Sequence, residues 1–197
     1  FRANDPDALN SWYREHLDRS LDMILDTGIP KDAAIIDVGG GSSTLVDDIL
    51  DGGFWDVSVL DISSKAIEKS QERLGVRAEK VTWLVGDVTE IDLSADRFDL
   101  WHDRAVFHFL TEEDDRRKYV DLVTHSLKAN GHFIVASFGP NGPQKCSGLD
   151  VVRYSPESMQ EEFGNSFKVI RSVEESHQTP FSTTQEFVYC AFQKVGS

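Results

Sequence analysis

Short apolar runs alternate with longer amphipathic stretches through the middle of the 197-residue chain. Uninterrupted apolar runs of this length are typical of strands that are buried on both faces of a parallel sheet. The expected strands are residues 33–36, 57–60, 81–85, 98–101 and 132–137. Helical periodicity between them predicts a helix after each strand. This alternation predicts an α/β fold with a doubly wound, Rossmann-like sheet, right-handed crossovers and helices on both faces.

The two ends of the chain follow different patterns. Residues 5–27 carry apolar side chains at helical spacing, which predicts an N-terminal helix within 1–30. Near the C-terminus, strand-like runs at 167–173 and 187–192 follow one another without a helix between them. Such a succession predicts an antiparallel hairpin at the sheet edge. We therefore expect a single domain, 1–197, with a seven-stranded, mostly parallel sheet and an antiparallel edge strand.

One helix start is expected from local chemistry. Thr111, with Asp114 three residues later, has the spacing of an N-cap and is expected to begin a helix that runs to about Leu127.

The first expected strand leads into a glycine turn. Asp37 closes the strand, residues 39–41 are all glycine, and an amphipathic run begins at Leu45. Glycine lets the backbone approach a ligand closely, and a helix N-terminus offers free N–H groups. The second strand ends in Asp61, about twenty residues later, where a βαβ unit places a carboxylate on ribose hydroxyls. This layout indicates a nucleotide-type cofactor site, although glycines after a strand also occur in plain tight turns.

Charge and composition narrow the partners. The net charge of -14 disfavours nucleic acid or an anionic membrane, because both require a basic surface. Cys146 and Cys190 lack CxxC spacing and are expected to be free thiols in a reducing compartment. No paired His or His/Cys spacing indicates a metal site, so none is expected. Without a membrane-length apolar segment or signal peptide, the expected location is cytoplasmic.

From residue 33 to 137 the chain resembles the class I S-adenosylmethionine-dependent methyltransferases. IIDVGGGSS resembles their first motif, Gly86-Asp87-Val88 the third, FDLWHDRAVFHFL the fourth-strand motif and LKANGHFIVASF the strand-five motif. The resemblance implies S-adenosyl-L-methionine as cofactor and methyl transfer, by in-line displacement, to a small molecule or a protein side chain. It implies that Asp61 binds the ribose hydroxyls and Asp87 the adenine amine. The implied cofactor contacts are Asp37, Gly39, Gly40, Gly41, Ser42, Asp61, Ile62, Gly86, Asp87, Val88 and His102.

Three residues after the fourth strand are candidates for catalysis. Asp103, Arg104 and His108 are expected to lie beside the transferable methyl group. Asp103 can accept a hydrogen bond from an amine, and His108 can remove a proton from the acceptor. The alternative is an Asp103–Arg104 surface pair with His108 packed against the sheet.

Substrate choice is expected to lie in residues 139–163, a long loop followed by a short helix. Long loops over a site are often functional. Arg153 suits an anionic substrate group, or alternatively pairs with a nearby acid. Tyr154, Trp12 and Tyr13 are further candidate substrate contacts, although packing is the commoner use of such aromatics.

Two other functions fit part of the pattern. A nicotinamide (NAD(P)-dependent) oxidoreductase would also use Gly39, Gly41 and Asp61, but Thr44 stands at its third fingerprint position and no Tyr-x-x-x-Lys pair occurs. A binding module without cofactor on the same fold is the other alternative. The closing segment, HQTPF followed by EFVYCAFQK, weakly resembles methyltransferases that modify protein lysine. The pattern indicates no oligomeric state.

Overall fold

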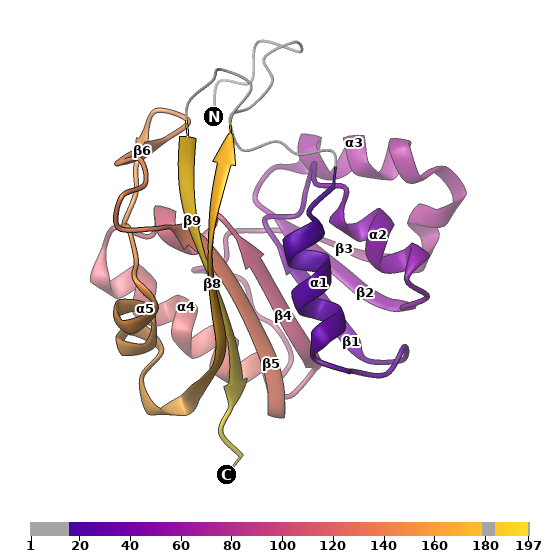
Figure 1. The fold of residues 1–197 in the computed structure, drawn as a ribbon. Helices are drawn as coiled ribbons and strands as arrows, with labels where there is room; N and C mark the ends of the chain where they lie inside the picture. The colour runs from indigo at the N-terminus through magenta and orange to yellow at the C-terminus, as the bar shows by residue number, and fades with distance from the viewer. Residues whose placement is uncertain (1–15, 179–183, 197) are drawn as a thin grey trace.

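The computed structural model describes residues 16–178 and 184–196, and these form a three-layer α/β fold (Figure 1). Its central sheet has seven strands in the order β3-β2-β1-β4-β5-β9-β8. Strands β1 to β5 pair in parallel, whereas β9 is antiparallel to both of its neighbours. The strands are β1 Ala34–Val38, β2 Asp56–Asp61, β3 Val81–Val85, β4 Phe98–Arg104, β5 Leu127–Phe138, β8 Phe167–Gln178 and β9 Thr184–Lys194. The predicted sheet and its antiparallel hairpin at the edge are confirmed.

Helices cover both faces of the sheet and connect most of its strands. Residues 86–97 join β3 to β4 without a helix, so the expected helix after the third strand is wrong. They are α1 Asp18–Asp26, α2 Leu45–Asp51, α3 Ser64–Leu74, α4 Glu113–Ser126 and α5 Pro156–Phe163. Short 3-10 turns, η1 Gly75–Lys80, η2 Phe107–Phe109 and η3 Gly164–Ser166, complete several connections. The expected N-terminal helix begins at Asp18 as α1, because His16 and Leu17 are not helical, and residues 1–15 lie outside the described ranges. Among the described residues, no helix is long and apolar enough to cross a membrane.

Alternation along each strand divides the core into two parts. Ile35, Leu100 and Ile134 belong to the apolar cluster that packs against α1 and α2. Ile36 and Trp101 belong to the second cluster, which packs against α4 and α5 on the opposite face. Figure 1 shows α1 in front of the sheet and α4 behind it. Since successive side chains in a strand point to opposite faces, neighbouring residues of β1 and β4 serve different layers.

A side chain caps the N-terminus of α3 but not that of α4. Ser63 caps α3, with its Oγ accepting a bond from the Ala66 N–H at 3.2 Å. Thr111 was the expected cap of α4, but that helix begins at Glu113 and no side chain caps it. The Thr111 N–H instead donates to the Phe109 carbonyl and continues the preceding turn. Acidic residues in the first turn of α4 stabilise its N-terminus through the helix dipole.

The loop of residues 139–154 contains a small hairpin of its own. Strands β6, Lys145–Cys146, and β7, Leu149–Asp150, pair with each other and not with the main sheet. The loop leaves the carboxyl end of β5, the same edge at which β1, β2 and β4 end (Figure 1). Cys146 lies in this hairpin and Cys190 in β9. Both are free thiols, as predicted, and both are buried. Residues 139–154 are therefore placed to border whatever binds at this edge.

Candidate functional site

The glycine turn after β1 presses its backbone against two carboxylates. Gly39 has φ +75°, a left-handed conformation that favours glycine. A Cβ at Gly40 would overlap Asp37 Oδ2, and a Cβ at Gly41 would lie 2.5 Å from Asp61 Oδ2. The absence of side chains here lets the turn pack directly on both acids. These positions thus require glycine for the site's geometry, rather than for a generic tight turn.

Asp61 links the turn to the second strand. Its Oδ2 accepts a hydrogen bond from the Gly41 N–H at 2.9 Å, and its Oδ1 accepts one from the Ser63 N–H at 2.8 Å. Burial raises the pKa of this carboxyl group, while the two N–H donors oppose the shift. Each carboxylate oxygen can accept further bonds, so Asp61 is held firmly and still has acceptor capacity.

The end of β3 supplies the neighbouring acid. The Gly86 N–H donates to the Asp61 carbonyl at 3.1 Å, which joins the two strand ends. Asp87 Oδ1 accepts bonds from Thr89 N–H at 2.8 Å and from Thr89 Oγ1 at 2.7 Å. Ile62 directly follows Asp61 and is 60% exposed, an unusual exposure for a large apolar side chain. Two half-buried carboxylates and an exposed apolar side chain therefore meet at this edge.

His102 lies behind the turn and not in it. Its Nδ1 is 2.7 Å from Asp37 Oδ1, and its Nε2 is 2.9 Å from Ser20 Oγ. All three side chains are buried. Both imidazole nitrogens are engaged by protein atoms, so direct contact between His102 and a cofactor does not fit its position. Asp37 Oδ2 is buried beside Gly40 and has no hydrogen-bond partner among the described residues.

Asp103 occupies the core and not a reactive position. Its Oδ2 accepts bonds from Tyr119 Oη at 2.6 Å and from the Phe107 N–H at 3.1 Å, and its Oδ1 from the Val106 N–H at 2.9 Å. Trp101 Nε1 donates to Tyr119 Oη at 3.1 Å. Burial raises the pKa of Asp103 to about 6. This fully buried carboxylate organises the turn after β4, and the expected direct contact with an amine does not fit.

The expected Asp103–Arg104 pair does not form either. Adjacent residues of β4 point to opposite faces of the sheet, which separates the two side chains. Arg104 Nε donates to Tyr189 Oη at 3.0 Å, and its guanidinium lies 4.6 Å from the centre of the Phe187 ring. Arg104 is thereby held between β4 and β9, at the edge where the strands end.

His108 is fully buried between two aromatic rings. Its ring centre lies 4.5 Å from that of Phe109 and 4.8 Å from that of Phe138. Burial, with the nearby Arg104 charge, lowers the pKa of His108 to about 3. An imidazole with this pKa cannot retain a proton at neutral pH, so a general-base role there is not favoured. The packed alternative agrees with its position.

Backbone hydrogen bonds attach the loop of residues 139–154 to β5 and to the turn after β4. The Val152 N–H donates to the His108 carbonyl at 2.8 Å, and the Tyr154 N–H donates to the Phe138 carbonyl at 2.9 Å. Tyr154 itself is buried, with its ring stacked 5.3 Å from that of Phe107. The side chain of Tyr154 therefore belongs to the core and not to a substrate-facing surface.

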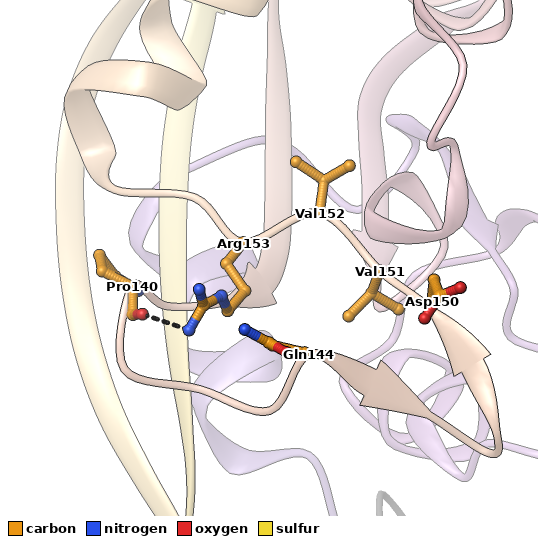
Figure 2. A pocket seen from close by; sticks show the side chains of 6 residues that line it. All are labelled: Pro140, Gln144, Asp150, Val151, Val152 and Arg153. Atoms are coloured by element: carbon orange, nitrogen blue, oxygen red, sulfur yellow. Dashed lines mark hydrogen bonds between the residues drawn. The ribbon is translucent and has the colours of Figure 1, made fainter.

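Within residues 16–178 and 184–196, Arg153 pairs with no acid and bonds instead to carbonyl groups of its own loop. Its Nη1 donates to the Pro140 carbonyl at 2.8 Å (Figure 2). The same atom donates to the Gly142 carbonyl at 3.4 Å. Arg153 lines a cavity of about 620 Å³ together with Pro140, Gln144, Asp150, Val151 and Val152. The Arg153 side chain thus links the two ends of its own loop through these hydrogen bonds. Trp12 and Tyr13 lie outside the described residues.

Comparisons with known proteins agree with this geometry. A family model described as a methyltransferase domain matches residues 35–131. A human protein named EEF1A lysine methyltransferase 2 is 23% identical over 171 residues, which cover 82% of this chain and 66% of the human protein. A SAM-dependent methyltransferase structure from Methanosarcina mazei has a TM-score of 0.74 at 15% identity, covering 88% of this chain and 98% of that one. Residues 35–131 match the methyltransferase domain family, and the chain has the fold of the class I S-adenosylmethionine-dependent methyltransferases.

A further solved structure contains ligands. It is Burkholderia thailandensis 1,6-didemethyltoxoflavin-N1-methyltransferase with bound 1,6-didemethyltoxoflavin and S-adenosylhomocysteine. This structure has a TM-score of 0.70 at 19% identity, covering 90% of this chain and 77% of that one. The present chain spans slightly less than two thirds of the human relative's length.

Several contributors to the site escaped sequence reasoning. Ser20 reaches His102 from α1, Val106 packs directly on Gly39, and Thr89 fixes Asp87. Thr89 had a local signal, since an Asp-x-Thr spacing commonly forms an Asx-type turn. Ser20 and Val106 had none, because their partners lie far away in the sequence.

Proposed function

We propose that this chain binds S-adenosylmethionine at the carboxyl ends of β1, β2 and β3, and transfers its methyl group to an acceptor beside β4 and β5. The observation that carries the proposal is the glycine turn packed on Asp37 and Asp61. A turn with this packing places the glycine backbone close to the Asp61 oxygens, which can accept further hydrogen bonds from a ligand with ribose hydroxyls. The buried, unpartnered Asp37 Oδ2 supports the same placement, because such an acceptor is normally satisfied by a ligand or water.

The described residues suit the separate parts of this cofactor. Asp61 would accept hydrogen bonds from the ribose hydroxyls, and Asp87 one from the adenine amine. Exposed Ile62 and buried Val88 would offer apolar contact to the base. The glycine turn would hold the methionine end.

Positioning is the main chemical task of the chain. S-adenosylmethionine, when bound, supplies a methyl group that its sulfonium already activates for in-line displacement. The protein therefore has to hold the acceptor in line and exclude water, which are effects of orientation and not of acid–base chemistry. Asp103 and Tyr119 keep the turn after β4 rigid against the glycine turn through Val106. Because His108 stays neutral and buried, an amine acceptor has to arrive without its proton or release it to solvent.

For the acceptor, we propose a protein lysine. The human relative is named a lysine methyltransferase, and this chain carries a net charge of -14, which attracts basic protein segments. The substrate loop, residues 139–154, borders the same edge and would select the acceptor. Small molecules are the other acceptor class, as in the Burkholderia enzyme.

Ligand-induced stabilisation tests the cofactor assignment. S-adenosylhomocysteine at 100 times its Kd should raise the free energy of unfolding by about 2.7 kcal/mol, whereas NAD should have no effect. Transfer of labelled methyl groups to lysine-rich proteins and to a panel of small amines then identifies the acceptor class. Stabilisation by NAD but not by S-adenosylhomocysteine would contradict the proposal.

The glycine turn provides a mutational prediction. Gly41→Ala places a Cβ 2.5 Å from Asp61 Oδ2 and 2.8 Å from the Ala66 Cβ. Overpacking of this kind costs about 1–3 kcal/mol, and it also displaces the ribose-binding carboxylate. We expect a lower melting temperature and weaker S-adenosylhomocysteine binding by calorimetry. Gly196→Ala is the matched control, since its Cβ meets only the flexible Asn130 side chain at 3.3 Å; equal affinities in the two variants would contradict the prediction.

A further inference from the structure

A network of hydrogen-bonded polar side chains crosses the apolar layer behind the glycine turn. It joins Ser20 of α1, His102 of β4 and Asp37 of β1, which are 0%, 1% and 2% exposed. The two contacts measure 2.9 Å and 2.7 Å. Sheet register places Asp37 directly beside His102, so both side chains point to the face that α1 covers. These three hydrogen-bonded side chains therefore connect α1 to the glycine turn by way of β4 and β1.

The donor and acceptor roles of the three side chains in this network are constrained. Asp37 as a carboxylate can only accept, so His102 Nδ1 carries the proton between them. His102 Nε2 faces the Ser20 hydroxyl, which can either donate or accept. Ser20 therefore satisfies the imidazole in either protonation state. Without Ser20, the buried Nε2 would lose its partner in apolar surroundings, at an energetic cost.

Asp37, the last residue of this network, lies directly against the glycine turn. Asp37 uses Oδ1 for His102, and its Oδ2 packs where a Cβ of Gly40 would stand. Rotation of this carboxylate would therefore push directly on the Gly40 backbone. Because the bond to His102 holds Oδ1 in one place, it also fixes where Oδ2 meets the turn, which makes this network suited to fixing a loop.

We propose that Ser20, acting through His102, is a positioning residue that fixes Asp37 beneath the glycine turn and so couples the docking of α1 to cofactor binding. This inference rests on the proposed function, because the turn is taken as the cofactor's binding loop. Ser20 touches no reacting atom; its effect reaches the ligand through two buried hydrogen bonds.

Three variants test the coupling. Ser20→Ala removes the hydroxyl, His102→Asn keeps a donor near the Nδ1 position but cannot reach Ser20, and the double variant removes both features. We expect about a tenfold loss of S-adenosylhomocysteine affinity in each single variant and no further loss in the double variant, because both interrupt one pathway. Ser20→Thr, which retains the hydroxyl, should recover most of the affinity. Hydrogen exchange at the amides of residues 39–41 should accelerate in Ser20→Ala but not in Ser20→Thr.

Ser126→Ala is the matched control. Ser126 is also a fully buried serine in a helix, but α4 covers the opposite face and its Oγ has no partner among the described residues. Its removal should leave affinity and exchange at residues 39–41 unchanged. If Ser20→Ala binds as tightly as Ser126→Ala, the coupling is refuted while the proposed function stands. If the unmodified chain itself fails to bind S-adenosylhomocysteine, the proposed function fails, and the coupling with it.

Discussion

Asp61→Ala is expected to weaken S-adenosylhomocysteine binding by about 10²- to 10⁴-fold. Under the proposed function, two charge-assisted hydrogen bonds to ribose hydroxyls would contribute about 1.5–3 kcal/mol each, and the substitution would remove both. It also releases the N–H groups of Gly41 and Ser63, which Asp61 now holds at 2.9 Å and 2.8 Å. Isothermal titration calorimetry measures the affinity, and a thermal melt of the same sample measures stability.

A second acid on the same strand provides the control. Asp56 begins β2, pairs with Arg97 at 2.6 Å and lies at the opposite end of the strand from the site. Asp56→Ala should lower stability modestly and leave ligand affinity unchanged. An Asp61→Ala variant that melts early yet binds with full affinity would show that Asp61 only caps the turn, and the ribose assignment would be abandoned.

The free energy of unfolding is expected to fall by on the order of 5 kcal/mol through His108 as the pH decreases from 6.5 to 3. The unfolded histidine takes up a proton near pH 6.5, whereas the folded pKa is lowered to about 3 by burial. The stabilising contribution is therefore complete above pH 6.5 and is lost as the pH falls through this window. Urea denaturation at several pH values measures it, and His108→Leu should flatten the curve.

Asp103 has the opposite effect on the free energy of unfolding over part of the same pH range. Its folded pKa is raised to about 6 from 3.8, so the folded state binds more protons than the unfolded state between these values. Its contribution is present below pH 3.8 and is lost as the pH rises through about 6, on the order of 3 kcal/mol. Asp103→Asn should therefore steepen the acid loss that His108 causes. A His108→Leu variant with an unchanged acid slope would contradict the assignment of that slope to His108.

The succession of strands along the chain, the glycine turn and the acids that follow the strands could be read from the sequence. These features depend on nearest neighbours along the chain: apolar runs of strand length, glycine where a side chain cannot fit, and an acid at a regular distance. The positions of Gly40, Gly41 and Asp61 followed from that pattern alone. The longer hairpin strands and the uncapped start of α4 did not, because pairing across the sheet and the preceding turn determine them.

Only the tertiary structure decided which polar residues face the site and which support it from behind. Asp103 and Arg104 are adjacent in sequence, yet the pleat of β4 sends one into the core and the other towards β9. His102 faces a partner 82 positions away, Ser20, and Arg153 bonds carbonyls of its own loop. Local patterns record where a strand ends, but they do not record what lies across the sheet. The sequence by itself thus determined the fold and the sheet edge proposed for the cofactor, whereas long-range contacts decided the surroundings of His102, Asp103, His108 and Arg153.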